Sequence, residues 1–198
     1  LAGEQQGCTL ADILLGKVNP SGKLNVSFPR STGNTPCFYN HFVTDREEPF
    51  DQPGTPEEPK GHYIFDKPEP LWNFGHGKSY TTFDYVDCAL SDTLLVASDT
   101  LKVSVTIKNT GRRDGKEVVQ LYVRDKVSTV ATPIQQLKAF QKVLIKPGES
   151  QCVELSLPIA ELALYNAKME EVVEPGDFEI QIGAASDDIR FKKTITIN

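Results

Sequence analysis

Residues 101–111 read LKVSVTIKNTG, and the first seven positions alternate strictly between apolar and polar side chains. This alternation has the period of a β-strand that buries one face and exposes the other. The Asn-Thr-Gly sequence at 109–111 places turn residues directly after it. The stretch therefore predicts a half-buried strand that ends in a turn, as in an all-β domain.

Similar patterns occur before and after this stretch. Alternating or apolar runs lie at 83–90, 119–123, 137–145, 153–157, 178–182 and 191–197. Pro-Gly pairs at 147–148 and 175–176 mark turns between them, and residues 158–165 are interpreted as one helical turn across an end. About seven short strands joined by turns predict a mainly β fold, an antiparallel β-sandwich of the immunoglobulin-like type.

The chain before residue 83 has a different character. Residues 9–15 (TLADILL) carry apolar side chains at helical spacing, and we expect a helix with Thr9 as N-cap and Gly16 as its end. Residues 19–22 (NPSG) predict a tight turn, and residues 23–28 (KLNVSF) predict a short strand. Because one helix and one strand cannot bury their own apolar faces, this segment should pack on a larger structure.

Residues 30–73 contain seven prolines and little periodicity, which predicts an irregular connector. The connector is rich in aromatic residues that a free linker would not need, so we expect it to lie across another surface. Trp72 and Tyr63 are weak candidates for the edge of a sugar-binding site, because aromatic faces stack on sugar rings. Packing of the connector on a domain uses the same residues and is the simpler interpretation.

The composition restricts the class of protein. The net charge of −6 argues against nucleic acid as a partner and offers no attraction to an anionic membrane. No apolar run approaches the length of a membrane helix. The first residues, LAGEQQG, include neither an initiator Met nor a charged region, so we expect no signal peptide in them, and the location stays open.

Four cysteines, Cys8, Cys37, Cys88 and Cys152, are widely spaced, and none belongs to a CxxC pair. A structural zinc site usually needs closely spaced pairs, so we expect no bound metal. Cys88 and Cys152 fall in predicted strands and are interpreted as buried thiols. The sequence leaves open whether any two of the four form a disulfide.

Other local patterns are interpreted as structural. The Gly22-Lys23 pair lacks the upstream glycine of a phosphate-binding loop. Adjacent carboxylates at 47–48, 57–58, 170–171 and 187–188 are interpreted as solvated surface. His41 and His76 are expected to make structural hydrogen bonds, and His62 has no visible partner. The glycosylation sequon at 25–27 lies in the predicted strand at 23–28, so we expect Asn25 to be unmodified.

Residues 74–83, FGHGKSYTTF, resemble the FGYGLSYTTF signature near the C-terminal end of glycoside hydrolase family 3 enzymes. Residues 11–28 (ADILLGKVNPSGKLNVSF) resemble the family segment ADVLFGxxNPSGKLPVTFP, and residues 39–41 (YNH) resemble the YYNH that follows it. The family's fibronectin type III-like domain resembles four further stretches: VSVTIKNTG, DGKEVVQLYVRD, LKAFQKVLIKPGES and VVEPGDFEIQIGAASDDI. The family pattern usually has Phe, Tyr and Leu where this chain has Leu15, His76 and Lys78.

The resemblance implies three parts. Residues 1–30 would be the end of an α/β sandwich domain, residues 31–82 the connector, and residues 83–198 a fibronectin type III-like β-sandwich. Family members are typically retaining enzymes with a nucleophilic Asp and, in many, an acid/base Glu, and both would lie upstream of Leu1. Retaining hydrolysis needs two carboxyl groups about 5–5.5 Å apart. We therefore expect no catalytic residue and no cofactor in this chain.

The implied parent enzyme hydrolyses terminal β-linked sugars, as β-glucosidases and β-xylosidases do. This chain would then brace the catalytic domains, and its partners would be the barrel and α/β domains of the same polypeptide and, through them, a β-glycoside. Secreted or periplasmic placement is common in similar proteins.

Two other interpretations stay open. In the first, the sandwich itself binds carbohydrate, with Tyr85, Tyr122 and Tyr165 as its main exposed aromatic candidates, although flat sugar-binding platforms generally need several aromatics. In the second, the chain is a freestanding structural domain. That interpretation does not explain the unpartnered helix and strand at its start.

Overall fold

The alternating stretch at 101–107 forms the middle of one sheet of a β-sandwich, in a computed structural model that describes residues 3–42, 56, 67 and 69–198. Strand β3 (Thr100–Asn109) lies between β1 (Phe83–Leu90) and β6 (Ser150–Pro158), and both pairings are antiparallel. The apolar positions of β3 are fully buried, and the polar positions between them are partly or fully exposed. The alternation in the sequence therefore correctly predicts which face of the strand is buried and which is exposed.

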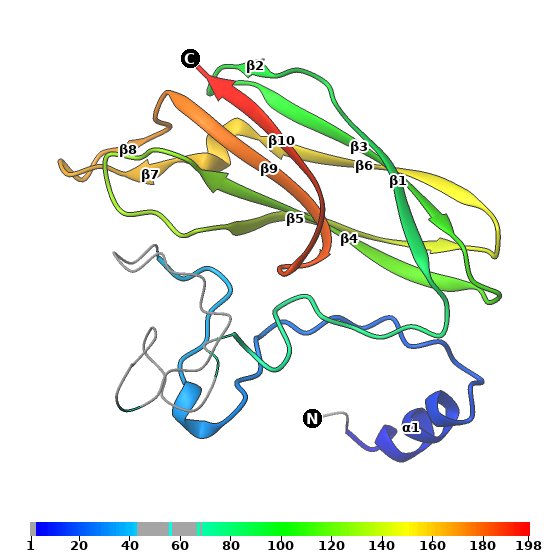
Figure 1. Ribbon diagram of the computed structural model, residues 1–198. Coiled ribbons are helices and arrows are strands. Elements are labelled where there is room, and N and C mark those ends of the chain that lie inside the picture. The colour runs from blue at the N-terminus through cyan, green and yellow to red at the C-terminus, as the bar shows by residue number, and fades with distance from the viewer. Residues whose placement is uncertain (1–2, 43–55, 57–66, 68) are drawn as a thin grey trace.

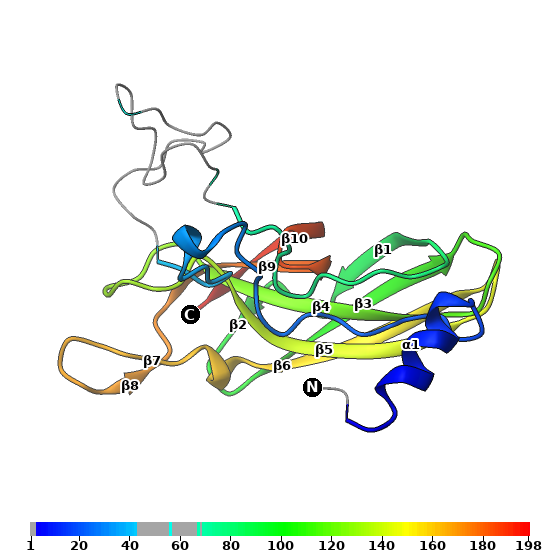
Figure 2. The ribbon, with the colours of Figure 1, turned by 90° about the horizontal axis from the view of Figure 1, so that it is seen from below.

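The second sheet has five strands in the order β2-β10-β9-β4-β5. Their bounds are β2, Leu94–Leu95; β4, Gly115–Asp125; β5, Gln136–Ile145; β9, Gly176–Ala185; and β10, Asp188–Ile197. All pairs are antiparallel except β2 with β10, which is parallel. Figures 1 and 2 show the two sheets packed face to face, with the segments before residue 83 on one side of them.

The predicted β-sandwich is confirmed, and each predicted run from 83 onward forms a strand. The predicted helical turn near 158–165 is the 3₁₀ helix η2 (Ile159–Leu162). Three strands of two residues each were not predicted: β2 and the two strands of a small hairpin, β7 (Leu164–Tyr165) and β8 (Glu171–Val172). The core combines inward side chains of both sheets, among them Leu101, Val119 and Ile180.

The prediction for Cys152 was wrong, whereas Cys88 is buried as expected. On β6 the inward positions are Val153, Leu155 and Leu157. Because side chains alternate between the two faces, Cys152 must point outward. All four cysteines of the chain are free thiols.

The N-terminal helix α1 (Gln6–Leu14) begins four residues earlier than predicted. Its N-cap is Gln5, which makes no capping bond through its side chain, so the predicted Thr9 cap is wrong. Gly16 has φ of +71°, and its left-handed backbone ends the helix as predicted. No residue of α1 is buried against the rest of the described chain.

The strand predicted at 23–28 is wrong, and so is the tight turn at 19–22. In this region only Phe28 forms an isolated β-bridge, with Trp72. A strand requires a regular partner, and the segment opposite it contains Gly75, whose φ of +81° interrupts an extended backbone. In the described part of the connector, the regular structure is the short 3₁₀ helix η1 (Thr32–Asn34).

Candidate functional site

Two segments before the sandwich lie side by side and contact it together. We call residues 19–28 the strap and residues 74–83 the signature segment. The Leu24 N–H donates to the His76 carbonyl at 2.8 Å, and the Gly75 N–H donates to the Leu24 carbonyl at 2.7 Å. Figure 1 shows both segments crossing below the sandwich, between α1 and the start of β1. The strap therefore reaches the sandwich as one layer with the signature segment.

Asn19 fixes the start of the strap. Its side-chain oxygen accepts bonds from the Tyr80 N–H at 2.8 Å and the Ser79 hydroxyl at 3.1 Å. Its amide group donates to the Asp114 carbonyl at 2.9 Å, in the turn before β4. Asn19, which suggested a turn in the sequence, instead connects three separate segments.

Gly75 allows the signature segment to approach β4 closely. A Cβ atom there would overlap Oε1 of Gln120 and lie 3.0 Å from Cα of Ala185. Gln120 is buried and held at both ends: its amide donates to the Ala184 carbonyl at 2.5 Å, and the Tyr122 hydroxyl donates to its Oε1 at 2.5 Å. The Ser186 N–H also bonds to the Phe74 carbonyl at 2.9 Å. These contacts leave no room for a side chain at position 75.

Three aromatic rings extend this contact into the connector. Tyr39 stacks on Phe74 with ring centroids 4.1 Å apart and meets Tyr122 edge-on at 5.9 Å. The Tyr39 hydroxyl accepts a bond from the Leu137 N–H at 3.2 Å. Burial raises the pKa of Tyr122, so this tyrosine stays protonated and keeps donating to Gln120. The connector thus packs on the sandwich of its own chain at Tyr39.

A buried asparagine joins the signature segment to the turn after β3. The Asn109 side-chain oxygen accepts bonds from the Thr81 hydroxyl at 2.7 Å and the Gly111 N–H at 3.0 Å. Its amide group donates to the Arg113 and Ile145 carbonyls, both at 2.8 Å. All the hydrogen-bonding positions of its amide head are therefore in use.

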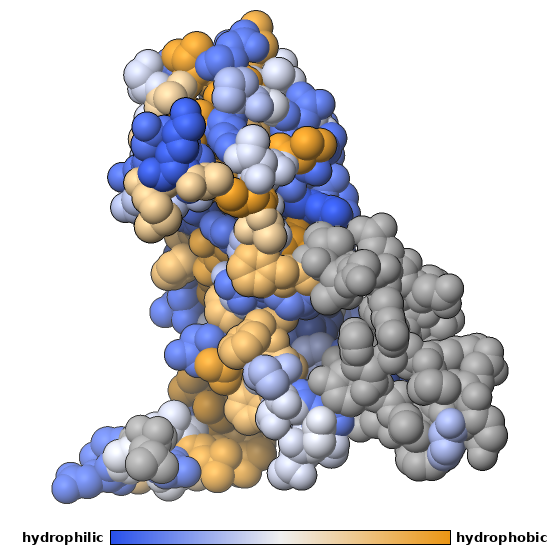
Figure 3. Space-filling view, turned by 90° about the vertical axis from the view of Figure 1, so that its left-hand side faces the viewer, coloured by the Kyte–Doolittle hydropathy of each residue, from blue (hydrophilic) through white to orange (hydrophobic). Residues whose placement is uncertain are grey.

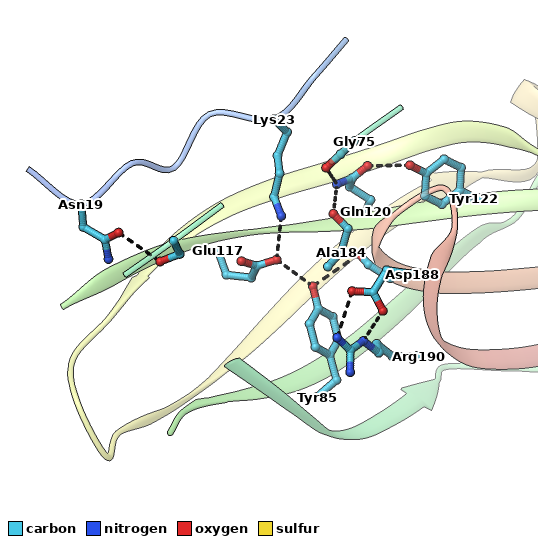
Figure 4. Close-up of polar contacts among 12 residues, drawn as sticks. Asn19, Lys23, Gly75, Tyr85, Glu117, Gln120, Tyr122, Ala184, Asp188 and Arg190 are labelled. Atoms are coloured by element: carbon cyan, nitrogen blue, oxygen red, sulfur yellow. Dashed lines mark hydrogen bonds and ion pairs between the residues drawn. The ribbon is translucent and has the colours of Figure 1, made fainter. Parts of the chain in front are cut away.

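A partly buried ionic cluster lies where the strap crosses β4. Lys23 Nζ is 3.3 Å from Glu117 Oε1, and the Tyr85 hydroxyl is 3.3 Å from the same oxygen. Figure 4 shows Glu117 between Lys23 on one side and Tyr85 on the other, with the Asp188–Arg190 pair beside Tyr85. Burial raises the pKa of Glu117, and the Lys23 charge opposes that rise. Tyr85 also has a raised pKa, chiefly through burial, so it remains a hydrogen-bond donor.

Of the two candidate sugar-contacting residues, only Trp72 can be placed. Its ring meets Phe28 edge-on, with centroids 5.8 Å apart, and it is 46% exposed. Tyr63 lies outside the described residues. A sugar-contacting role for this pair therefore stays a prediction.

Other predicted features are placed as follows. His41 Nδ1 lies 3.1 Å from the Phe42 carbonyl, and His76 accepts the strap bond through its backbone. His62 and the carboxylates at 47–48 and 57–58 lie outside the described residues, while Glu170 and Glu171 are exposed. The strand that was expected to protect the sequon is absent, and Asn25 is exposed at a bend. Within the described ranges, no group of three or more His, Cys, Asp or Glu side chains could hold a metal.

The aromatic candidates for carbohydrate binding by the sandwich were partly wrong. Tyr122 is fully buried, and Tyr85 is partly buried with its hydroxyl in the ionic cluster. Tyr165 is exposed, on the small hairpin of β7 and β8. Only one of the three can offer an exposed ring face.

Sequence reasoning missed Glu117, Gln120 and Asn109, the polar residues that join the N-terminal segments to the sandwich. Two of them carried a signal. Glu117 and Asn109 have the same phase as the apolar residues of their strands, so alternation places both inward. Gln120 has the opposite phase and is buried because the signature segment covers it.

Large exposed hydrophobic side chains concentrate before the sandwich. Among the residues that the structure describes, eleven such side chains precede residue 83, against eight after it, although the sandwich is the longer part. They are Leu10, Leu14, Leu15, Val18, Val26, Phe28, Phe38, Phe42, Leu71, Trp72 and Tyr80. Figure 3 shows hydrophobic residues along much of the height of one face, including its lower part. An apolar surface of this kind is typical of a contact with another protein surface.

Family models match two parts of the chain. Residues 1–80 match the glycosyl hydrolase family 3 C-terminal domain, and residues 117–186 match a fibronectin type III-like domain. The chain belongs to the C-terminal region of glycoside hydrolase family 3. The signature segment therefore lies where the first match ends, next to the first strand of the sandwich.

Relatives within glycoside hydrolase family 3 match almost the whole chain. A periplasmic beta-glucosidase of Salmonella typhimurium is 40% identical over 93% of the chain and 24% of its own length. A beta-xylosidase of Formosa agariphila is 40% identical over 95% of the chain and 25% of its own length. The crystal structure of a beta-glucosidase from Listeria innocua in complex with glucose matches with a TM-score of 0.84, 37% identity, and coverage of 97% of this chain and 26% of that one.

The chain spans about a quarter of the length of these family 3 relatives. It corresponds to their C-terminal region, as the sequence motifs implied. No helix in the described residues is both long enough and apolar enough to span a bilayer.

Proposed function

We propose that this chain is the C-terminal part of a retaining β-glycosidase that hydrolyses terminal β-linked glucose or xylose residues. The chain itself braces the catalytic domains. The observation that carries this proposal is the exposed apolar surface of α1 and the neighbouring segments, within the part that matches the family 3 C-terminal domain. The relatives, which are about four times as long, include both β-glucosidases and a β-xylosidase.

The proposed organisation follows the three parts inferred from the sequence. Residues 1–30 complete an α/β domain, residues 31–82 connect, and residues 83–198 form the sandwich. The partners are the barrel and α/β domains of the same polypeptide, which supply both catalytic carboxyl groups and bind the β-glycoside. The periplasmic relative supports a secreted or periplasmic location.

The first test is an assay of the isolated chain on aryl β-glucosides and aryl β-xylosides. We expect no turnover above the buffer rate, because both carboxyl groups would lie outside the chain. The longer polypeptide that contains this chain should hydrolyse at least one of the two substrates. Turnover by the isolated chain at a rate comparable with that of the longer polypeptide would contradict the proposal.

The bracing role predicts that Leu14→Ser has an effect that depends on context. In the isolated chain Leu14 is 71% exposed, so Leu14→Ser should change the free energy of unfolding, measured in urea, by less than about 0.5 kcal/mol. In the longer polypeptide the same change should lower the unfolding midpoint of the domain that contacts α1. Leu101→Ala, at a buried position, is the matched control and should cost about 2–5 kcal/mol in both. An equally small effect of Leu14→Ser in both proteins would argue against a contact at α1.

A further inference from the structure

The ion pair between the strap and the sandwich is more buried than the other ion pairs of the described residues. The side chains of Lys23 and Glu117 are 18% and 7% exposed. In each of the other four pairs, at least one side chain is 45% exposed or more. Exposed pairs contribute little, whereas breaking a buried pair leaves a charge without compensation.

Each element around Glu117 contributes a defined group. Glu117 extends from β4, and Tyr85 approaches it from β1. Asp188 and Arg190 face the cluster from β10. Arg190 forms an ion pair with Asp188, with Nε 2.6 Å from Oδ1, and its guanidinium lies over the Tyr85 ring. The strap contributes Lys23, which is the cation bonded to Glu117 in the described structure.

The sandwich contacts the Glu117 carboxylate through Tyr85, on the side away from the strap (Figure 4). Tyr85 is fixed between Glu117 and the Gly183 carbonyl, each 3.3 Å from its hydroxyl, and neither contact depends on the strap. If the strap moved away, Glu117 would keep its contact with Tyr85 in the sandwich but would lose its cation. An enclosed carboxylate without a counter-charge takes up a proton more readily.

We propose that Lys23 and Glu117 form a proton-sensitive latch, in which protonation of Glu117 loosens the strap while the sandwich stays folded. A neutral Glu117 can still bond to Tyr85, but Lys23 is left without its partner in a partly buried position. A Cβ at Gly77 would lie 2.8 Å from Lys23 Cδ, so the lysine stem passes tightly against the signature segment. Lys23 therefore regains water most readily when the strap moves outward.

Acid is expected to weaken the contact between the strap and the sandwich, whereas at Glu117 it increases the free energy of global unfolding. Burial raises the pKa of Glu117 above its value in an unfolded chain, so the folded state binds the proton more tightly. The contribution of Glu117 to the free energy of unfolding is therefore greatest at low pH, and it is lost as the pH rises through the raised pKa. Acidification thus favours the folded sandwich at Glu117 while it removes the charge that holds the strap.

Hydrogen exchange of the whole chain at pH 7.5 and pH 5 tests the latch. The reporter is the Leu24 amide, which bonds to the His76 carbonyl, and rates are corrected for the intrinsic effect of pH. We expect its protection factor to fall about tenfold at pH 5, as for a coupling worth one pKa unit, while the amides of β3 keep theirs. Leu24 protection that is constant or rises on acidification would overturn the proposal.

Variants separate the latch from a general effect of acid. Glu117→Gln and Lys23→Met should each give low Leu24 protection at both pH values, because neither can form the ion pair. Lys102→Met removes an exposed pair with Glu154 and should keep the wild-type response. Protection of β3 amides shows whether each variant is folded. A wild-type pH response in folded Glu117→Gln would show that another group is responsible and would refute the latch.

Discussion

Asn109→Ala is expected to lower the free energy of unfolding by about 3–4 kcal/mol, a large effect for a single polar side chain. The substitution removes four hydrogen bonds and leaves the Thr81 hydroxyl, the Gly111 N–H and two carbonyls without their partner. A buried group left unsatisfied costs about 1–3 kcal/mol, and repacking or entering water recovers part of the sum. Because Asn109 is fully buried, water has little access to the site.

Urea unfolding of the chain, followed by far-UV circular dichroism, measures this effect. Asn166→Ala is the matched control, because Asn166 also bonds through both ends of its amide but is only partly buried, and its hydrogen bonds are exposed to water. It should cost less than about 1 kcal/mol, since water replaces its bonds. Asn109→Asp should also be strongly destabilising, because a carboxylate cannot donate to the Arg113 and Ile145 carbonyls. Equal small losses at Asn109 and Asn166 would show that the buried bonds are not important for stability.

Asn109 also shows how far the sequence predicts this fold. Alternation at 101–107 predicted the faces of β3, and the same phase extended by two residues places Asn109 inside. Its place in the Asn-Thr-Gly sequence instead predicted that it begins the turn after the strand. Strands that form a core of their own are predictable in this way, because the hydrophobic pattern that drives their burial is local in the sequence.

The contact between the N-terminal segments and the sandwich was less predictable. Gln120 lies on the outward phase of β4, and only the covering signature segment, some 45 residues earlier, makes it buried. Likewise, the alternation at 23–28 predicted a strand, but the opposing segment has the wrong backbone conformation at Gly75. Both outcomes depend on long-range pairing that no local window of the sequence contains.

Gly75→Ala is expected to release the signature segment from β4. The contact between this segment and the sandwich should lose about 3 kcal/mol of stability. About 1–2 kcal/mol comes from forcing a residue with a Cβ into a left-handed backbone, since φ at Gly75 is +81°. The remainder comes from overlap with Gln120, which cannot rotate away without breaking its bonds to Ala184 and Tyr122. Neither the Gln120 side chain nor the Ala185 backbone can move away from the new methyl group without a large cost in stability.

Gly148→Ala separates the two contributions. Gly148 has a similar φ of +77°, but a Cβ there has nothing within 4 Å, so this variant should show the backbone cost alone. Trp72, the only tryptophan, lies three residues before Gly75, and its fluorescence reports on the signature segment, while circular dichroism reports on the sandwich. We expect Gly75→Ala to shift the Trp72 emission to longer wavelength at urea concentrations at which the sandwich is still folded, and Gly148→Ala to leave that emission unchanged.

If the two variants lose the same stability, backbone strain explains both and the close approach at Gly75 contributes nothing. If Gly75→Ala costs more, the glycine of the signature is required by Gln120, a residue of the sandwich itself.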